Sequence, residues 1–160
     1  MLKLTKKADY GLIALKHLAN HQNDCASSAK EISDCYGIPL PILAKVLQAL
    51  VRSGFLRSEH GVNGGYKLAR DPREITTLEV IRAIDGPILL THCFNEHGAE
   101  CDQSDRCTVR DPLRKVHEGI LRLLGGMSIA DMSQDDKPSE SRSALPALDP
   151  AAGLPVFRNV

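Results

Sequence analysis

The chain has 160 residues with 20 Lys and Arg against 20 Asp and Glu, so its formal net charge is zero. Hydrophobic residues make up 42% and charged residues 25%, as in an ordinary globular protein. Aromatic residues make up only 4%, which excludes a stacking platform for single-stranded nucleic acid.

The sequence carries no segment that addresses it to a membrane or to the secretory route. No run of about 18 apolar residues is present, and the basic N-terminus lacks the apolar stretch of a signal peptide. We therefore expect a cytoplasmic protein without a membrane partner. In that reducing compartment five cysteines favour metal ligation, reactive thiols or core positions over disulfides.

The N-terminal half has the pattern of a winged helix-turn-helix. Apolar residues recur at helical spacing between Leu4 and Asn20, which leaves Lys6, Lys7, Lys16 and His17 for solvent. The pair Ser28 and Glu31 predicts a capping box for a second helix that ends at Gly37. A third helix follows Pro39-Leu40-Pro41 and stops at Gly54. Two short strands, 55–59 and 66–69, flank a Gly-Asn turn at 61–65, which predicts a hairpin wing.

The second half predicts a helix, a loop and a longer helix. Thr76 and Glu79 form a second capping box, for a helix that runs to Gly86. The stretch 91–107 has no periodicity and is predicted to be a loop. Asp111-Pro112 predicts the cap and first turn of a long helix, with one more turn at 128–132. The fold class is therefore mainly α: a winged helix-turn-helix with a small β-hairpin wing, a cysteine loop and a long dimerisation helix.

Charge is distributed unevenly along the chain. Residues 1–75 hold 11 Lys and Arg against 7 Asp and Glu, residues 76–133 hold 6 against 9, and residues 134–160 hold 3 against 4. We interpret these three parts as a DNA-binding region, a sensor region with the dimerisation helix, and a disordered tail. The basic excess lies where phosphate contacts are needed.

The second helix of a helix-turn-helix enters the DNA major groove, while a wing reaches an adjacent groove or the phosphates. Within the expected recognition helix Lys45, Gln48 and Arg52 lie off the apolar stripe. Further candidates for backbone contacts are Lys30, Arg57, His60, Asn63 and Lys67. Two alternatives stay open: these side chains are simply solvated, or the winged helix binds a protein.

Three cysteines, Cys93, Cys101 and Cys107, fall within fifteen residues of the predicted loop. Thiolates bind zinc, copper(I) and iron–sulfur clusters, but the spacing is not the paired Cys-x2-Cys of structural zinc sites. A fourth ligand has to come from elsewhere. The candidates are His92, His97, His117 and a carboxylate such as Asp9. A zinc- or thiol-based redox regulator remains an alternative, as do three free thiols.

The helix from Pro112 to Leu124 carries an apolar face, although the preceding helices already close a core. Symmetric DNA sites are usually bound by dimers, so this face predicts the seam of a homodimer on a palindromic operator. No paired carboxylates, nucleophile–base pair or phosphate loop stands at a suggestive spacing, so we do not expect an enzyme.

Three motifs in order resemble the Rrf family of bacterial winged-helix iron–sulfur regulators, of the IscR and NsrR type: the opening 4–12, the wing 61–68 and the cysteine loop. The resemblance covers residues 1–133 and lies nearest to regulators of SUF cluster assembly. It implies a homodimeric transcription factor, such as a repressor, that holds an iron–sulfur cluster on Cys93, Cys101 and Cys107, with 2Fe–2S favoured over 4Fe–4S. It also implies that His60 and the wing glycines, Gly64 included, approach the DNA minor groove.

The chain departs from the family pattern at two places. IscR-like members have a histidine three residues after the last cysteine, where this chain has Arg110. NsrR-like members use an aspartate in the first helix of the partner subunit, and Asp9 stands at the matching position, which makes it the preferred fourth ligand. Pro39 and Pro41 stand where many members open the recognition helix with hydroxyl residues, so base readout has to differ there.

Overall fold

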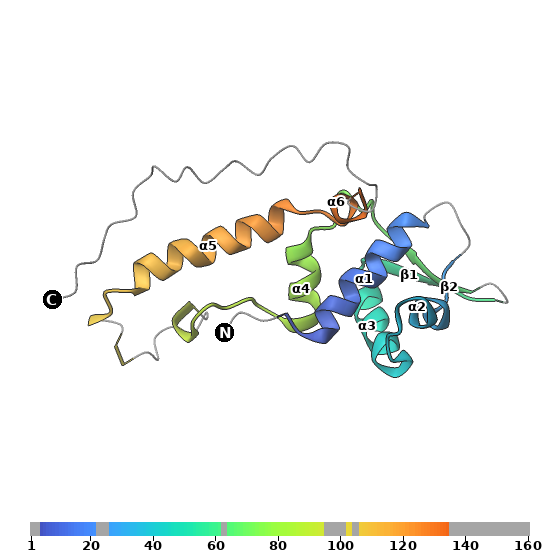
Figure 1. Ribbon diagram of the computed structural model, residues 1–160, viewed down its shortest axis with the longest axis horizontal. Coiled ribbons are helices and arrows are strands. Elements are labelled where there is room, and N and C mark those ends of the chain that lie inside the picture. Colours follow the sequence, from blue (N-terminus) through green and yellow to red (C-terminus); the bar gives the residue numbers. More distant parts are fainter. Residues whose placement is uncertain (1–3, 22–25, 62–63, 95–101, 104–105, 135–160) are drawn as a thin grey trace.

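The computed structural model describes residues 4–21, 26–61, 64–94, 102–103 and 106–134. It is mainly helical with one antiparallel hairpin, as predicted (Figure 1). The elements in chain order are α1 (Lys6–Asn20), α2 (Ala29–Tyr36), α3 (Leu40–Arg52), β1 (Leu56–Glu59), β2 (Gly65–Leu68), α4 (Thr77–Asp85), the 3-10 turn η1 (His92–Phe94), α5 (Arg110–Gly126) and α6 (Ile129–Gln134).

The helix starts follow local capping rules. Both predicted capping boxes are present, because Ser28 and Thr76 each accept a hydrogen bond from the backbone N–H of the glutamate three residues on, at 3.1 and 3.2 Å. In turn, the carboxylate of each glutamate accepts a hydrogen bond from the backbone N–H of the capping residue. Gly37 ends α2 with φ 63°, a left-handed conformation that glycine adopts without steric cost.

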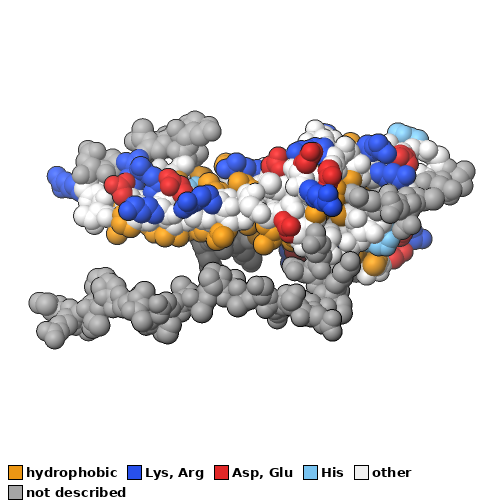
Figure 2. Space-filling view, turned by 90° about the horizontal axis from the view of Figure 1, so that it is seen from above, with side chains coloured by type: hydrophobic (Ala, Val, Ile, Leu, Met, Phe, Trp, Pro, Cys, Tyr) orange, Lys and Arg blue, Asp and Glu red, His pale blue; other side chains and the backbone are white. Residues whose placement is uncertain are grey.

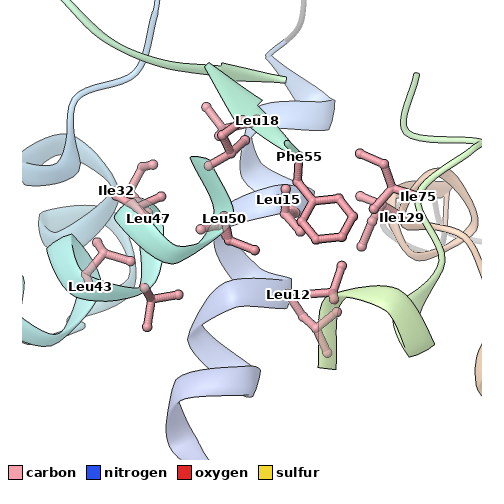
Figure 3. Close-up of a cluster of buried hydrophobic side chains, with 14 of the residues drawn as sticks. Leu12, Leu15, Leu18, Ile32, Leu43, Leu47, Leu50, Phe55, Ile75 and Ile129 are labelled. Carbon is pink, nitrogen blue, oxygen red and sulfur yellow. The ribbon is translucent and has the colours of Figure 1, made fainter. Parts of the chain in front are cut away.

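The core is built where α1, α2, α3 and α6 meet. Figure 3 shows side chains from these helices and from the connecting segments converging there. Leu15, Ile32, Leu43, Leu47 and Leu50 are fully buried, and each such side chain contributes about 1.5–3 kcal/mol. Val80 and Ile129 belong to the same cluster, so the packing is continuous from the helix-turn-helix into α4 and α6.

The wing is a two-stranded hairpin in which Leu56 pairs with Leu68 and Glu59 with Gly65. It is fastened to the start of α2, since Ser27 exchanges two backbone hydrogen bonds with Tyr66, at 2.9 and 3.3 Å. A Cβ on Gly65 would lie 2.5 Å from the Ser27 carbonyl oxygen, so only glycine allows this approach. The wing is therefore held in a fixed position beside α2 and α3.

The long helix α5 begins earlier than predicted. Asp111 is not its cap: the helix starts at Arg110 and its N-cap is Val109, without a side-chain hydrogen bond. Pro112 is accommodated in the first turn because the first four amides of a helix have no intrahelical partner. Asp111 instead lies 3.6 Å from Arg114 in an ion pair.

The body of α5 projects from the winged helix as an extended arm (Figure 1). It buries none of its residues within the subunit, and Val116 and Leu123 are 52% and 76% exposed. Figure 2 shows hydrophobic side chains gathered along one edge of this arm, with charged side chains on the face above them. Among the described residues no helix has the length and apolarity needed to cross a bilayer. The predicted tail, from residue 135 on, lies outside the described residues.

Candidate nucleic-acid interface and thiol segment

The exposed side of α3 carries the polar residues that the sequence predicted. Lys45, Gln48 and Arg52 are all exposed, while Leu43, Val46, Leu47 and Leu50 face the core. The spacing of three and four residues places the three polar side chains on one side of the helix. Lys30 is exposed on α2. The helix-turn-helix thus presents cations and an amide on its outer surface.

The wing adds two cations that share one carboxylate. Arg57 Nε and Lys67 Nζ lie 3.7 and 3.6 Å from the two carboxylate oxygens of Glu59. Both cations are among the predicted contact residues and Glu59 is not, although strand alternation places all three residues on one face of the hairpin. His60 is exposed and follows β1. Asn63 lies outside the described residues.

Gly64 has a structural reason to be glycine. A Cβ at this position would lie 2.6 Å from the Glu59 carbonyl oxygen and 2.9 Å from that of Gly61. The end of the wing is therefore closed too tightly for a side chain at residue 64. Gly64 is therefore needed for the shape of the wing, independently of any contact with DNA.

The predicted cysteine loop, 91–107, is called the thiol segment below. Its described part includes Cys93 in η1 and Cys107 just before α5. Both thiols are unpaired and half-buried, and Thr91 Oγ1 lies 3.0 Å from Cys93 Sγ in a hydrogen bond. Cys101 and His97 lie outside the described residues. Within the described ranges no three His, Cys, Asp or Glu side chains form a group able to hold a metal.

The thiol segment contacts the arm. The Phe94 ring lies 5.1 Å from the His117 ring of α5, centroid to centroid, tilted by 30°. His117 Nδ1 is buried and has no hydrogen-bond partner in the described structure. Cys93, adjacent to Phe94, is thereby held next to a contact with the middle of α5.

Asp9 is exposed in the first turn of α1. This end of α1 is anchored by Thr5, whose hydroxyl donates to the Asp85 carboxylate at the end of α4 at 2.7 Å. The carboxylate of Asp9 therefore stands on a fixed helix and is open to solvent or to a second subunit.

His17 is buried, so the prediction that it faces solvent was wrong. Its exposed fraction is 4%, because the ring is stacked on His21 at 4.3 Å and meets the edge of Tyr36 at 5.6 Å. Burial, with a further contribution from His21, lowers the pKa of His17 below 6.5, and Glu31 opposes the shift. The i, i+4 spacing of the two histidines was the available signal.

A helix-turn-helix with an exposed polar second helix, a fixed wing and a projecting arm defines a winged-helix DNA-binding transcriptional regulator. A family model described as Rrf2, iron-dependent transcriptional regulator, matches residues 4–135. The chain therefore belongs to the Rrf2 family, whose members are regulators of transcription and not enzymes.

Individual relatives agree with this assignment. The chain is 31% identical over 134 residues to the HTH-type transcriptional regulator NsrR of Geobacillus kaustophilus (strain HTA426), covering 84% of this chain and 91% of the relative. Among solved structures it is similar to T. potens IscR, with TM-score 0.69 and 27% identity over 89% of this chain and 94% of that one. It also shares the fold of CymR, the global cysteine regulator of B. subtilis, with TM-score 0.72 and 24% identity over 84% and 98% of the two chains.

Proposed function

We propose that the protein is an iron–sulfur-sensing transcriptional regulator that controls genes for SUF cluster assembly. The observation that carries the proposal is the contact between Phe94 and His117, which joins the thiol segment to the helix that would pair two subunits. Membership in a family described as iron-dependent supports the choice of iron.

The donor set fits an iron–sulfur cluster. Cys93 and Cys107 are unpaired and only half-buried, so their thiols are available as ligands, and Cys101 would supply the third. Thiolates are the usual ligands of such clusters, and a nitrogen or oxygen donor can replace one of them. When bound, the cluster supplies a redox-sensitive centre that is lost on oxidation or when iron is scarce.

The chain's own residues would transmit that loss to DNA. Ligation of Cys93 would fix η1, and the contact of Phe94 with His117 would in turn restrain α5. The arms of two subunits set the separation of their recognition helices, which has to be about 34 Å for successive half-sites of a palindromic operator. A small shift at the seam therefore changes DNA affinity, which links the two sites thermodynamically.

The test is anaerobic purification followed by iron, sulfide and zinc analysis and visible absorbance. Cys93→Ala is expected to lose iron and colour. Cys35→Ala is the matched control, because Cys35 is an exposed thiol on α2 outside the segment, and it should keep both. The iron-to-protein ratio separates 2Fe–2S, which we favour, from 4Fe–4S. Stoichiometric zinc in a colourless wild-type protein would instead support the zinc regulator.

The fourth ligand is tested with a pair of variants. We propose Asp9 of the partner subunit, because its carboxylate is exposed on a fixed helix. His117 is the competing donor, because its Nδ1 is buried without a partner beside Phe94. Asp9→Ala should shift the visible spectrum or shorten the lifetime of the cluster in air, while His117→Ala should not shift the spectrum. The reverse result would assign the position to His117.

The target genes are tested by DNA binding. A palindromic duplex from the promoter of a SUF operon should bind with an affinity that falls steeply with salt. Cluster-loaded and cluster-free protein should differ in this affinity. Equal affinity of the two forms would contradict sensing by the cluster without contradicting DNA binding.

A further inference from the structure

The first turn of α3 presents an apolar surface to solvent. Leu40 and Ile42 are 41% and 40% exposed, and Pro39 and Pro41 are exposed beside them. The buried stripe of the helix begins only at Leu43. These four residues, the apolar first turn, therefore lie on the outside of the helix that DNA-binding proteins of this class insert into the major groove.

The apolar first turn offers almost no hydrogen-bond donors. Its cap, Pro39, makes no side-chain hydrogen bond, and neither proline carries an N–H. The amides of Ile42 and Leu43 both donate to the Pro39 carbonyl, at 3.0 and 3.1 Å. A turn built in this way cannot recognise bases through side-chain hydrogen bonds, although N-terminal residues of recognition helices usually contact base edges.

Cations follow the apolar first turn along the exposed side of the helix. Lys45 and Arg52 follow it along the exposed side of α3, with Gln48 between them, and Lys30 is exposed on α2. An apolar turn followed by cations on the same exposed side of the helix matches the major groove, where phosphates line the edges and the C5-methyl of thymine is the apolar group on the floor. A purely apolar protein partner would not require these cations.

We propose that Leu40 and Ile42 recognise thymine through its C5-methyl group, as specificity-determining residues at the start of the recognition helix. Gln48, about two turns further on, then meets the next base edges, where its amide suits adenine. The proposal rests on the DNA-binding function and not on the metal ligands.

The experiment begins with selection of duplexes from a random double-stranded library by the full-length protein, in whichever cluster state binds more tightly. Each thymine of the selected half-site is then replaced by deoxyuridine, which lacks only the methyl group. Binding is measured by fluorescence anisotropy. At one or two positions the affinity should fall about fourfold, the equivalent of one methyl group's burial.

Protein variants connect this loss to the apolar first turn. Leu40→Ala and Ile42→Ala should bind the thymine and deoxyuridine duplexes with equal affinity, with circular dichroism unchanged. Gln48→Ala is the comparison variant: it should bind more weakly overall but keep the discrimination, because its contact lies further along the helix.

Three results would overturn the proposal: equal binding of thymine and deoxyuridine at every position, a selected half-site without thymine, or full discrimination in both alanine variants. The comparison of thymine with deoxyuridine duplexes uses the wild-type protein, so its result is valid even if a substitution disturbs folding. Any of these results would instead favour a protein as the binding partner of the apolar first turn. Absence of salt-dependent DNA binding would contradict the DNA-binding function as well, and so is distinguishable from the other three.

Discussion

Glu59 controls how much of the wing's positive charge is available to DNA. Its carboxylate contacts both Arg57 and Lys67, and all three side chains are partly exposed. Exposed ion pairs of this kind contribute only about 0–1 kcal/mol, so phosphates can displace Glu59 from its partners. The carboxylate nevertheless opposes the approach of DNA.

Glu59→Gln should therefore raise DNA affinity, roughly twofold to fivefold for an interaction of about 0.4–1 kcal/mol. The dependence on salt should steepen, because two freed cations release more counterions from the duplex. Anisotropy titrations at several salt concentrations measure both effects. Asp111→Asn on α5 is the control, since it also removes an exposed ion-paired carboxylate. An equal gain in this control would show a general charge effect.

His17 makes stability depend on pH. Its pKa is lower in the folded protein than the usual 6.5, because burial disfavours the charged ring. Between the two pKa values the unfolded state binds more protons, so stability is complete above about 6.5 and falls as the pH drops below it. Thermal melts between pH 7.5 and 5.5 should show this fall. His17→Gln should flatten the profile, whereas His60→Gln, at an exposed position, should keep it.

At the level of elements, the wing depends on its contact with the start of α2. Gly65→Ala places a Cβ against the Ser27 carbonyl, and overpacking of this kind typically costs about 1–3 kcal/mol. Urea unfolding should show that loss, and DNA affinity should fall as well because the wing is displaced. Gly126→Ala, where a Cβ meets nothing within 4 Å, should change stability by less than about 0.5 kcal/mol. Equal effects would mean that the Ser27 contact does not position the wing.

The elements that sequence predicted correctly are the ones fixed by neighbouring residues. The capping boxes at Ser28 and Thr76 and the turn at Gly37 depend on residues three or four apart, and all three are present. The burial of His17 was missed because Tyr36, which covers one edge of its ring, lies on another helix. The contact of Phe94 with His117 spans the whole thiol segment, so no local pattern signals it.

At the scale of the molecule, α5 explains why a neutral chain suits a DNA-binding protein. The basic excess lies in residues 1–75, and the acidic residues that balance it lie in the later segments. Two of these acidic residues, Asp111 and Glu118, lie on α5, which projects away from the winged helix (Figure 1). Phosphate attraction can therefore act at one end without being cancelled at the same place, because exposed charges further apart than about 10 Å are largely screened.

The apolar edge of α5 predicts that the active form is a homodimer. Leu123 is 76% exposed and Val116 52%, and these positions share one side of the helix. Leu123→Glu puts a charge on that side, and a charge cannot be buried against a second apolar helix without a partner. Light scattering should therefore show the 17.4 kDa monomer in place of a dimer.

Loss of the dimer should also weaken binding to the operator DNA. Two joined recognition helices bind a palindrome with an avidity that one helix lacks, so operator affinity should fall about 100-fold or more. The fold itself should survive, because Leu123 buries little within its own subunit. Lys115→Glu, on the polar side of α5, should remain dimeric and keep its affinity. A Leu123→Glu protein that stays dimeric, or a wild type that is monomeric while bound to DNA, would contradict the seam and require another arrangement of the recognition helices.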